Sequence, residues 1–137
     1  MAFLTTRVKP PVEDDWGYLN KLMKYIKGKL GVKLNLRVDR LSVIKWWVYA
    51  SFVTDNNLRG HTGGMMSIGS GAITSSSRNQ NINGRSSTDN KLILVNDIMG
   101  PVLWALYFIQ GQGYTVERNI MFQDNQSTMR LMLNGKK

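Results

Sequence analysis

The chain contains one histidine, His61, and no cysteine. A disulfide scaffold, a thiolate zinc site and a cysteine nucleophile are therefore excluded. One histidine cannot supply a cluster of imidazole metal ligands, and a Ser/His/Asp triad would depend on His61 alone. We expect His61 to form a hydrogen bond in a turn. The side chains that remain for chemistry are carboxylates and basic groups.

Basic side chains dominate the charge of the chain. Eighteen Lys and Arg oppose nine Asp and Glu, which gives a formal charge of +9 and a pI near 10.0. Residues 1–45 hold ten basic and four acidic residues, so most of the excess lies in the first third. Such a charge favours polyanionic partners, with nucleic acid first.

The first element predicted to position these groups is a helix over about residues 13–28. Pro10 and Pro11 precede it, and an acidic triplet suits its positive N-terminal end. Apolar residues recur at three- and four-residue spacing and predict one buried face; they are Trp16, Leu19, Leu22, Met23 and Ile26. Lys21, Lys24 and Lys27 fall mostly on the other side. A solvated face is the favoured interpretation of these lysines, and phosphate contact is the alternative.

Strands are predicted next along the chain. Residues 34–38 suit a short strand, and residues 41–52 suit a central one because both of its faces are mostly apolar. Residues 62–68 and 72–78 suit two hairpin strands separated by Gly69, Ser70 and Gly71.

A long apolar helix is predicted over about residues 88–111. Ser86 and Asp89 form a capping-box pattern at its start, and Gly100 with Pro101 should kink or split it. A strand over residues 118–123 and a short helix to about residue 133 complete the chain. The order of elements is helix, three strands, helix, strand, helix, which indicates an α/β fold with a mixed sheet.

This order and several sequence blocks resemble the ribonuclease H domain at the end of the Pol polyprotein of copia-type LTR retrotransposons. The blocks are WWVYASF (46–52), GHTGGMMSIGSGAI (60–73), RSSTDNKLILVND (85–97), LWALYFIQGQGY (103–114) and FQDNQSTMRL (122–131). Residues 3–28 are similar to the segment that joins reverse transcriptase to this domain. The resemblance covers essentially the whole chain. It implies a connection segment with a basic amphipathic helix at residues 1–40 and a ribonuclease H-like domain, incomplete at its C-terminus, at residues 41–137.

The resemblance also implies where catalytic acids should lie. The family cleaves RNA in RNA:DNA hybrids with two Mg²⁺ ions, which need several carboxylate ligands. The first family acid lies in W-V-D-A-S, where this chain has Tyr49, and the second lies in S-S-T-E-A-E-L, where it has Lys91. The third lies in Q-D-N-x-S and corresponds to Asp124. The fourth belongs to a motif downstream of Lys137.

These substitutions predict that nuclease activity is lost. Asp89 precedes Lys91 by two positions, a helical rotation of about 200°, so it lies on roughly the opposite face and suits the cap instead. Asp124 is then a lone carboxylate beside an ammonium group. We expect Mg²⁺ to bind weakly or not at all, and no other cofactor is implied.

If nuclease activity is lost, nucleic-acid binding is the function that remains, and the resemblance implies an RNA:DNA hybrid as the ligand. Lys91 is placed to meet a phosphate, but an accidental substitution in a decaying element is the favoured interpretation. Other donors surround the connection into the long helix, with ordinary solvent exposure as the alternative; they are Arg78, Asn79, Gln80, Asn83 and Arg85. Trp46, Trp47 and Trp104 are expected in the core first and as base-stacking platforms second.

Two other functions stay open. One is an active hybrid ribonuclease completed by another chain or by missing sequence, and the other is a host-adopted protein-interaction module. The N-terminus lacks the apolar region of a signal peptide, and no apolar run approaches about 20 residues. We therefore expect no membrane partner and an intracellular location, cytoplasmic or nuclear.

Overall fold

The computed structural model describes residues 11–52 and 59–135, and the chain divides into two compact units, Met1–Leu34 and Asn35–Lys137. The second unit begins earlier than the expected boundary at residues 40/41. The reason is β1 (Arg37–Val38), which pairs with β4 (Gly69–Ser70) and so ties this segment to the strands that follow.

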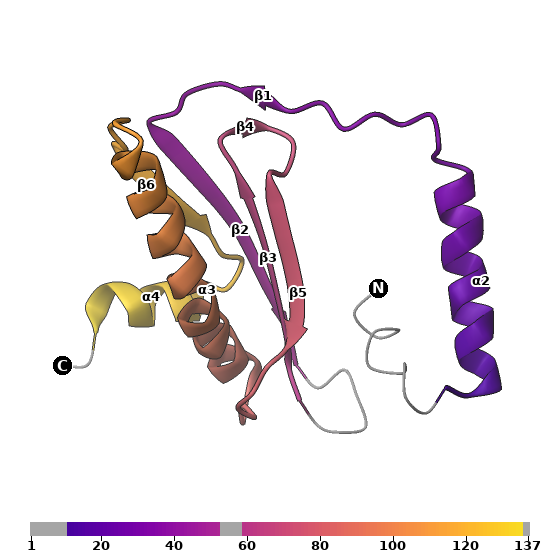
Figure 1. Cartoon of the computed structure of the whole chain (residues 1–137). Coiled ribbons are helices and arrows are strands. Elements are labelled where there is room, and N and C mark those ends of the chain that lie inside the picture. The colour runs from indigo at the N-terminus through magenta and orange to yellow at the C-terminus, as the bar shows by residue number, and fades with distance from the viewer. Residues whose placement is uncertain (1–10, 53–58, 136–137) are drawn as a thin grey trace. The chain divides into compact units, whose positions relative to one another are not determined.

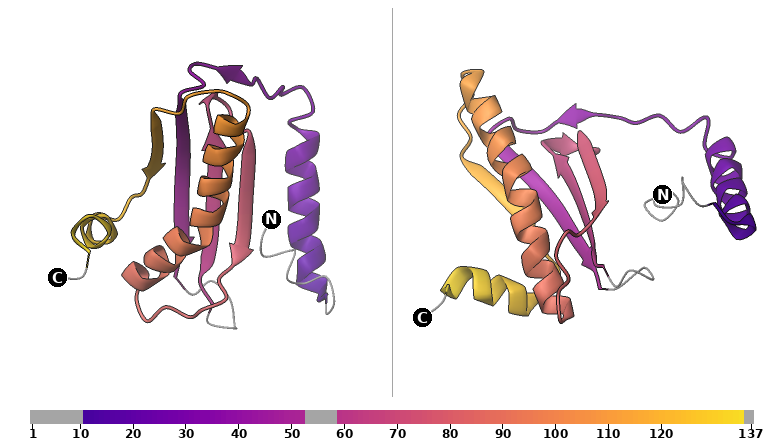
Figure 2. Two further views of the ribbon diagram at one scale, coloured as in Figure 1. Left: turned by 60° about the vertical axis from the view of Figure 1, so that its left-hand side comes forward. Right: turned by 60° about the horizontal axis from the view of Figure 1, so that its bottom comes forward.

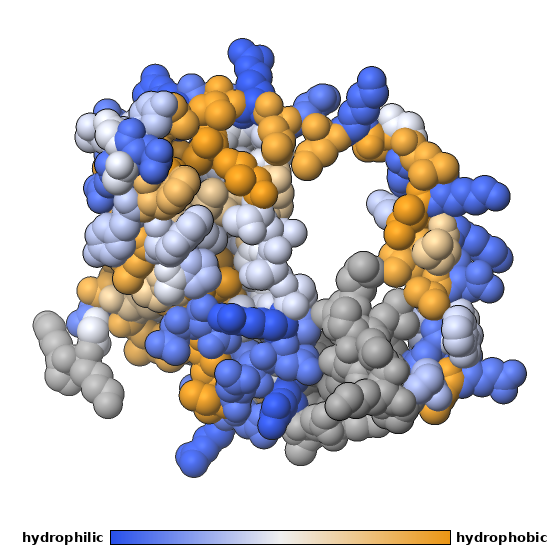
Figure 3. All heavy atoms as spheres, in the orientation of Figure 1, coloured by the Kyte–Doolittle hydropathy of each residue, from blue (hydrophilic) through white to orange (hydrophobic). Residues whose placement is uncertain are grey.

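The described part of the first unit contains α2 (Glu13–Lys27), which confirms the predicted helix. The Asp15 carboxylate accepts a hydrogen bond from the Val12 N–H at 2.9 Å and so closes the N-terminal turn. Figure 3 shows apolar side chains along one side of α2 and hydrophilic ones along another. Within the described residues of its own unit, the apolar stripe is not covered, and Trp16 and Met23 are exposed.

The second unit is built on a four-stranded sheet in the order β5-β3-β2-β6 (Figure 1). Its strands are β2 (Val43–Ser51), β3 (His61–Ser67), β5 (Thr74–Asn79) and β6 (Arg118–Phe122). β2 pairs antiparallel with β3, β3 pairs antiparallel with β5, and β6 pairs parallel with β2. The unit is therefore a mixed α/β structure, and β2 is a central strand as expected.

One face of this sheet is covered by α3 (Ser87–Gly111), and α4 (Gln126–Asn134) contacts α3 (Figure 2). Alternate residues of β2 point toward α3 because successive strand side chains face opposite ways. The buried core combines these residues with one stripe of α3; its members are Ile44, Trp46, Val48, Ala50, Met66, Leu94, Ile98, Val102 and Ala105. Trp46 fulfils the expected core role, and its Nε1 donates to Asn119 Oδ1 at 3.0 Å.

α3 remains one helix through Pro101, so of the two predicted outcomes, a kink or a split, the split does not occur. Proline has no N–H, and the Asp97 carbonyl four residues earlier therefore lacks its usual helical donor. Arg78 of β5 supplies a replacement, because its Nη2 donates to the Asp97 carbonyl at 2.5 Å.

By length and composition, α3 is long and apolar enough to cross a membrane, although polar residues interrupt its apolar sequence. Leu94 and Ile98 on its inner face pack against the sheet. The helix thus serves as the core helix of this unit.

Candidate functional site

The structure brings together two of the residues singled out from the sequence, Lys91 and Asp124. Lys91 lies in the second turn of α3 and is 8% exposed, while Asp124 lies in the loop after β6 with more than half of its side chain exposed. The Lys91 ammonium donates to Asp124 Oδ1 and forms an ion pair with it. The Asp124 carboxylate is therefore neutralised by Lys91.

The QDNQS motif explains how Asp124 is held beside Lys91. The Asp124 N–H donates to the Gln123 side-chain oxygen at 2.9 Å. Asn125 then caps α4, because its side-chain oxygen accepts from the Thr128 N–H at 2.8 Å. These two local bonds on either side of Asp124 fix the turn from strand to helix and leave its carboxylate for Lys91.

Tyr49 lies at the same end of the sheet as Asp124. β2 and β6 run parallel with Trp47 opposite Phe122, and Tyr49 and Asp124 each lie two residues beyond that pair. The Tyr49 side chain, however, belongs to the strand face that α3 does not cover and is 61% exposed. Among the described residues, no hydrogen bond links its phenol to the ion pair.

The described side chains do not fit Mg²⁺. They include no group of three or more His, Cys, Asp or Glu that could hold a metal ion. Asp89 does not fill the gap, because its N–H donates to Ser86 Oγ and its carboxylate accepts from the Arg85 N–H, each at 3.1 Å. Ser86 is thus the N-cap of α3, as predicted, but the Asp89 carboxylate accepts from the N–H of the residue before the N-cap, so the second bond of a strict capping box is replaced by a neighbouring one. Asp124 is the single carboxylate that residues 11–52 and 59–135 bring to the site, and Lys91 already neutralises it.

Gln80 is a correction to the predicted nucleic-acid contacts, because its side chain is fully buried. Its Nε2 donates to Thr62 Oγ1 at 3.1 Å and to the Asn90 carbonyl at 2.8 Å. Thr62 in turn donates to Asp97 Oδ2 at 2.9 Å. Gln80 therefore fastens β3 to the start of α3 and has no surface to offer a ligand.

Arg78 and Asn79 also have partners within the domain. Arg78 serves the Asp97 carbonyl, as described above. On the other face of the sheet, Asn79 Oδ1 lies 2.8 Å from His61 Nδ1, and Ser77 Oγ lies 2.8 Å from His61 Nε2. His61 is thus the expected hydrogen-bonding residue, although it lies on strand β3 rather than in a turn.

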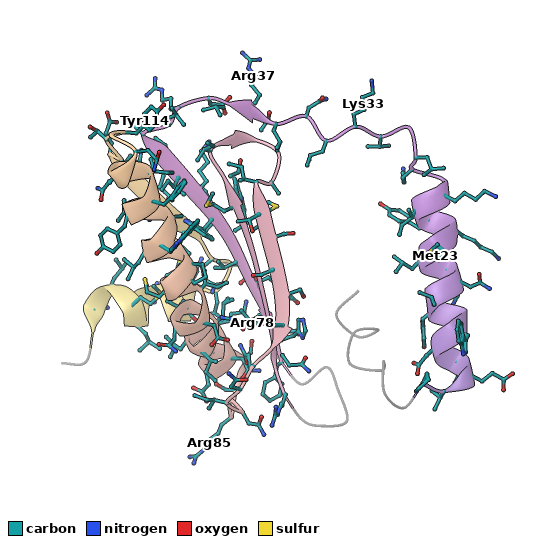
Figure 4. All side chains as sticks on the ribbon, in the orientation of Figure 1. Met23, Lys33, Arg37, Arg78, Arg85 and Tyr114 are labelled. Carbon is teal, nitrogen blue, oxygen red and sulfur yellow. The ribbon has the colours of Figure 1, made fainter. Side chains whose placement is uncertain are left out.

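Asn83 and Arg85 remain exposed in the connection between β5 and α3. Figure 4 shows Arg85 projecting from this connection and Arg78 near the adjacent end of β5. The two guanidinium groups form the basic part of the predicted contact region. Arg78 uses its guanidinium within the domain, whereas no described contact engages that of Arg85.

Sequence reasoning did not identify Asn90, which is almost fully buried and donates through Nδ2 to the Ser51 carbonyl at 3.4 Å. Gly60 and Gly84 make room for it, because a Cβ at either position would clash with the Asn90 side chain. The two glycines were the available signal, since a glycine is required where a neighbouring group approaches the backbone this closely.

Comparisons with protein-family models, with curated proteins and with solved structures found no match to this chain.

Proposed function

We propose that this chain is a catalytically inactive ribonuclease H-like domain of copia-type Pol ancestry that binds nucleic acid, with an RNA:DNA hybrid as ligand. Three antiparallel strands, a crossover helix and a parallel fourth strand agree with the element order that the resemblance implies. The observation on which the proposal depends most is the ion pair between Lys91 and Asp124.

The ion pair argues against two-metal hydrolysis. Two Mg²⁺ ions require several hard oxygen ligands and concentrated negative charge. Here the ammonium group of Lys91 neutralises Asp124, and Tyr49 contributes a phenol in place of the first family acid. A cation entering this site would have to displace Lys91 and would then meet a single carboxylate.

Binding to the sugar-phosphate backbone needs no metal site. Arg85 and Asn83 supply exposed donors beside the N-terminus of α3, and the chain as a whole has a formal charge of +9. Contacts of this type position a duplex without reading its sequence, and they weaken as salt rises because counterion release becomes less favourable. Lys91 is excluded as a phosphate contact because its ammonium is engaged with Asp124.

Binding and cleavage of a short fluorescent RNA:DNA hybrid test the proposal together. We expect affinity that falls linearly with salt on logarithmic axes, a modest loss in Arg85→Ala, and no cleavage with Mg²⁺ or Mn²⁺. Arg130→Ala, which removes an exposed charge on α4, is the matched control. Cleavage that Asp124→Asn abolishes would contradict the loss of activity, and absence of binding at low salt would contradict the ligand.

A further inference from the structure

The sheet face opposite α3 carries a different set of side chains from the site above. Strand register places three aromatic residues on it: Trp47 and Tyr49 lie two residues apart on β2, and Phe122 of β6 lies opposite Trp47. We call these three residues the aromatic face. Trp47 is 39% exposed, Tyr49 61% and Phe122 43%. Trp47 therefore belongs to the surface, unlike its neighbour Trp46.

The aromatic face is held in a fixed arrangement. The Trp47 and Phe122 rings stack with centroids 5.3 Å apart and an interplanar angle of 24°. Tyr49 extends from the same strand face beyond them, on a backbone paired with Gly63 of β3. Because Gly63 has no side chain, nothing from the neighbouring strand position covers the Tyr49 ring. Rigid, exposed rings of this kind lose little conformational entropy when a planar ligand stacks on them.

The chemistry around the aromatic face favours a polyanion. On this face, the strand positions of β2, β3, β5 and β6 include no Asp or Glu; their polar and basic members are Lys45, Ser51, His61, Ser67, Ser75, Ser77, Asn79 and Arg118. Asp39 lies outside these strands, where it lines a pocket with Arg40 and Lys45. Aliphatic residues Val43, Met65 and Ile120 also lie on this face, and the cations Lys45 and Arg118 among them favour an anionic ligand over a purely apolar one.

We propose that the aromatic face binds unpaired bases of single-stranded nucleic acid, with bases stacked on Tyr49 and Trp47 and a phosphate near Lys45. Exposed aromatic rings beside basic side chains are the general means of binding single strands without sequence preference. The inference rests on the proposed function for the class of ligand. It assigns the ligand to a surface separate from Asn83 and Arg85, which lie in the connection into α3.

Fluorescence anisotropy of the full chain with a labelled oligo-dT of about 12 nucleotides, within the range that single-strand sites cover, tests this inference. We expect Tyr49→Ala to bind about tenfold more weakly, the loss of roughly one base stack. Tyr49→Phe keeps the ring and should bind like the unmodified chain. Trp104→Ala is the matched control, because Trp104 is 66% exposed on α3 and belongs to another surface.

The same variants are measured with a fully paired RNA:DNA hybrid, whose bases are not available for stacking. Tyr49→Ala should leave hybrid binding unchanged, so failure of the two proposals can be told apart. Equal oligo-dT binding by Tyr49→Ala and the unmodified chain would overturn the inference even if hybrid binding persists. An equal loss of oligo-dT affinity in Trp104→Ala would also overturn the inference. So would a dimer, detected by sedimentation analysis, that Tyr49→Ala dissociates, because the aromatic face would then join two copies of the chain.

Discussion

Lys91 and Asp124 decide the chemistry of this domain at the scale of single residues. A buried ammonium is stable only when a partner compensates its charge. Asp124 provides that compensation from a mostly exposed position, so the pair is neither fully buried nor an ordinary surface salt bridge. Asp124 therefore stabilises a buried lysine, and its replacement should affect folding before it affects any reaction.

Asp124→Ala should lower the free energy of unfolding by about 1–2 kcal/mol, because it leaves the Lys91 ammonium without its partner; the exposure of Asp124 keeps the cost below that of a fully buried pair. Urea denaturation measures the change. Lys91→Met combined with Asp124→Ala removes both charges and should recover most of the loss. If the double variant is no more stable than Asp124→Ala, the ion pair does not account for the effect.

The sequence predicted part of this site. The resemblance singled out Tyr49, Lys91 and Asp124, and it implied that the Asp124 carboxylate lies beside the Lys91 ammonium. The burial of Gln80 could not be predicted in the same way, because it depends on Thr62 and Asn90, which approach Gln80 only after β3, β5 and α3 have packed. A polar residue in a polar stretch looks exposed until its long-range partners are known.

At the scale of elements, α3 shows how a neighbouring strand compensates for a defect in a helix. Pro101 leaves the Asp97 carbonyl without its helical donor, and Arg78 replaces that donor from β5. The proline rule correctly identified the lost hydrogen bond. The split did not follow, because the replacement comes from a residue that the sequence places on a separate strand.

Arg78→Ala should therefore lower the free energy of unfolding by about 1 kcal/mol, the usual worth of a partly exposed hydrogen bond. In a Pro101→Ala background the loss should shrink, since the substituted residue supplies its own N–H to the Asp97 carbonyl. Thermal or urea unfolding of the four chains in this double-mutant cycle gives the coupling free energy between Arg78 and Pro101. Arg85→Ala is the matched control and should leave stability unchanged; additive effects of Arg78→Ala and Pro101→Ala would rule out the compensation.

Close packing at the start of α3 gives a second test. Gly60→Ala should destabilise the domain by about 1–3 kcal/mol, because its Cβ would clash with the buried side chains of Gln80 and Asn90, which cannot move into solvent. Gly100→Ala lies in the same unit, meets no atom within 4 Å and should be neutral or stabilising by up to about 1 kcal/mol. The midpoints of urea denaturation compare the stabilities of the two variants. A tolerated Gly60→Ala would contradict the packing described here.

At the scale of the whole molecule, the chain separates into a basic N-terminal unit and a mixed α/β unit. Local patterns predicted the described helices and the strands of the four-stranded sheet to within a few residues. The pairing of β1 with β4 was beyond them, because Gly69 and Ser70 were expected to separate two strands. This long-range pairing places the segment from Asn35 in the second unit.

The first unit should act as an electrostatic anchor. Met1–Leu34 holds seven basic and three acidic residues, so a chain that begins at Asn35 loses a net charge of +4. This shorter chain should keep its fold by circular dichroism. It should bind the hybrid more weakly, with a shallower dependence of affinity on salt, because fewer phosphates are neutralised. An unchanged salt slope would show that the anchor takes no part in binding.

The most direct test of the central claim, that Asp124 and Lys91 form an ion pair in place of a two-metal site, is an NMR titration of the full chain with Mn²⁺. We expect no saturable broadening centred on the backbone signals of Asp124 and Asn125 at millimolar Mn²⁺, and an unchanged titration in Asp124→Asn. Saturable broadening at those residues that Asp124→Asn removes would contradict the account, because it would show that the carboxylate holds a metal ion despite the lysine beside it.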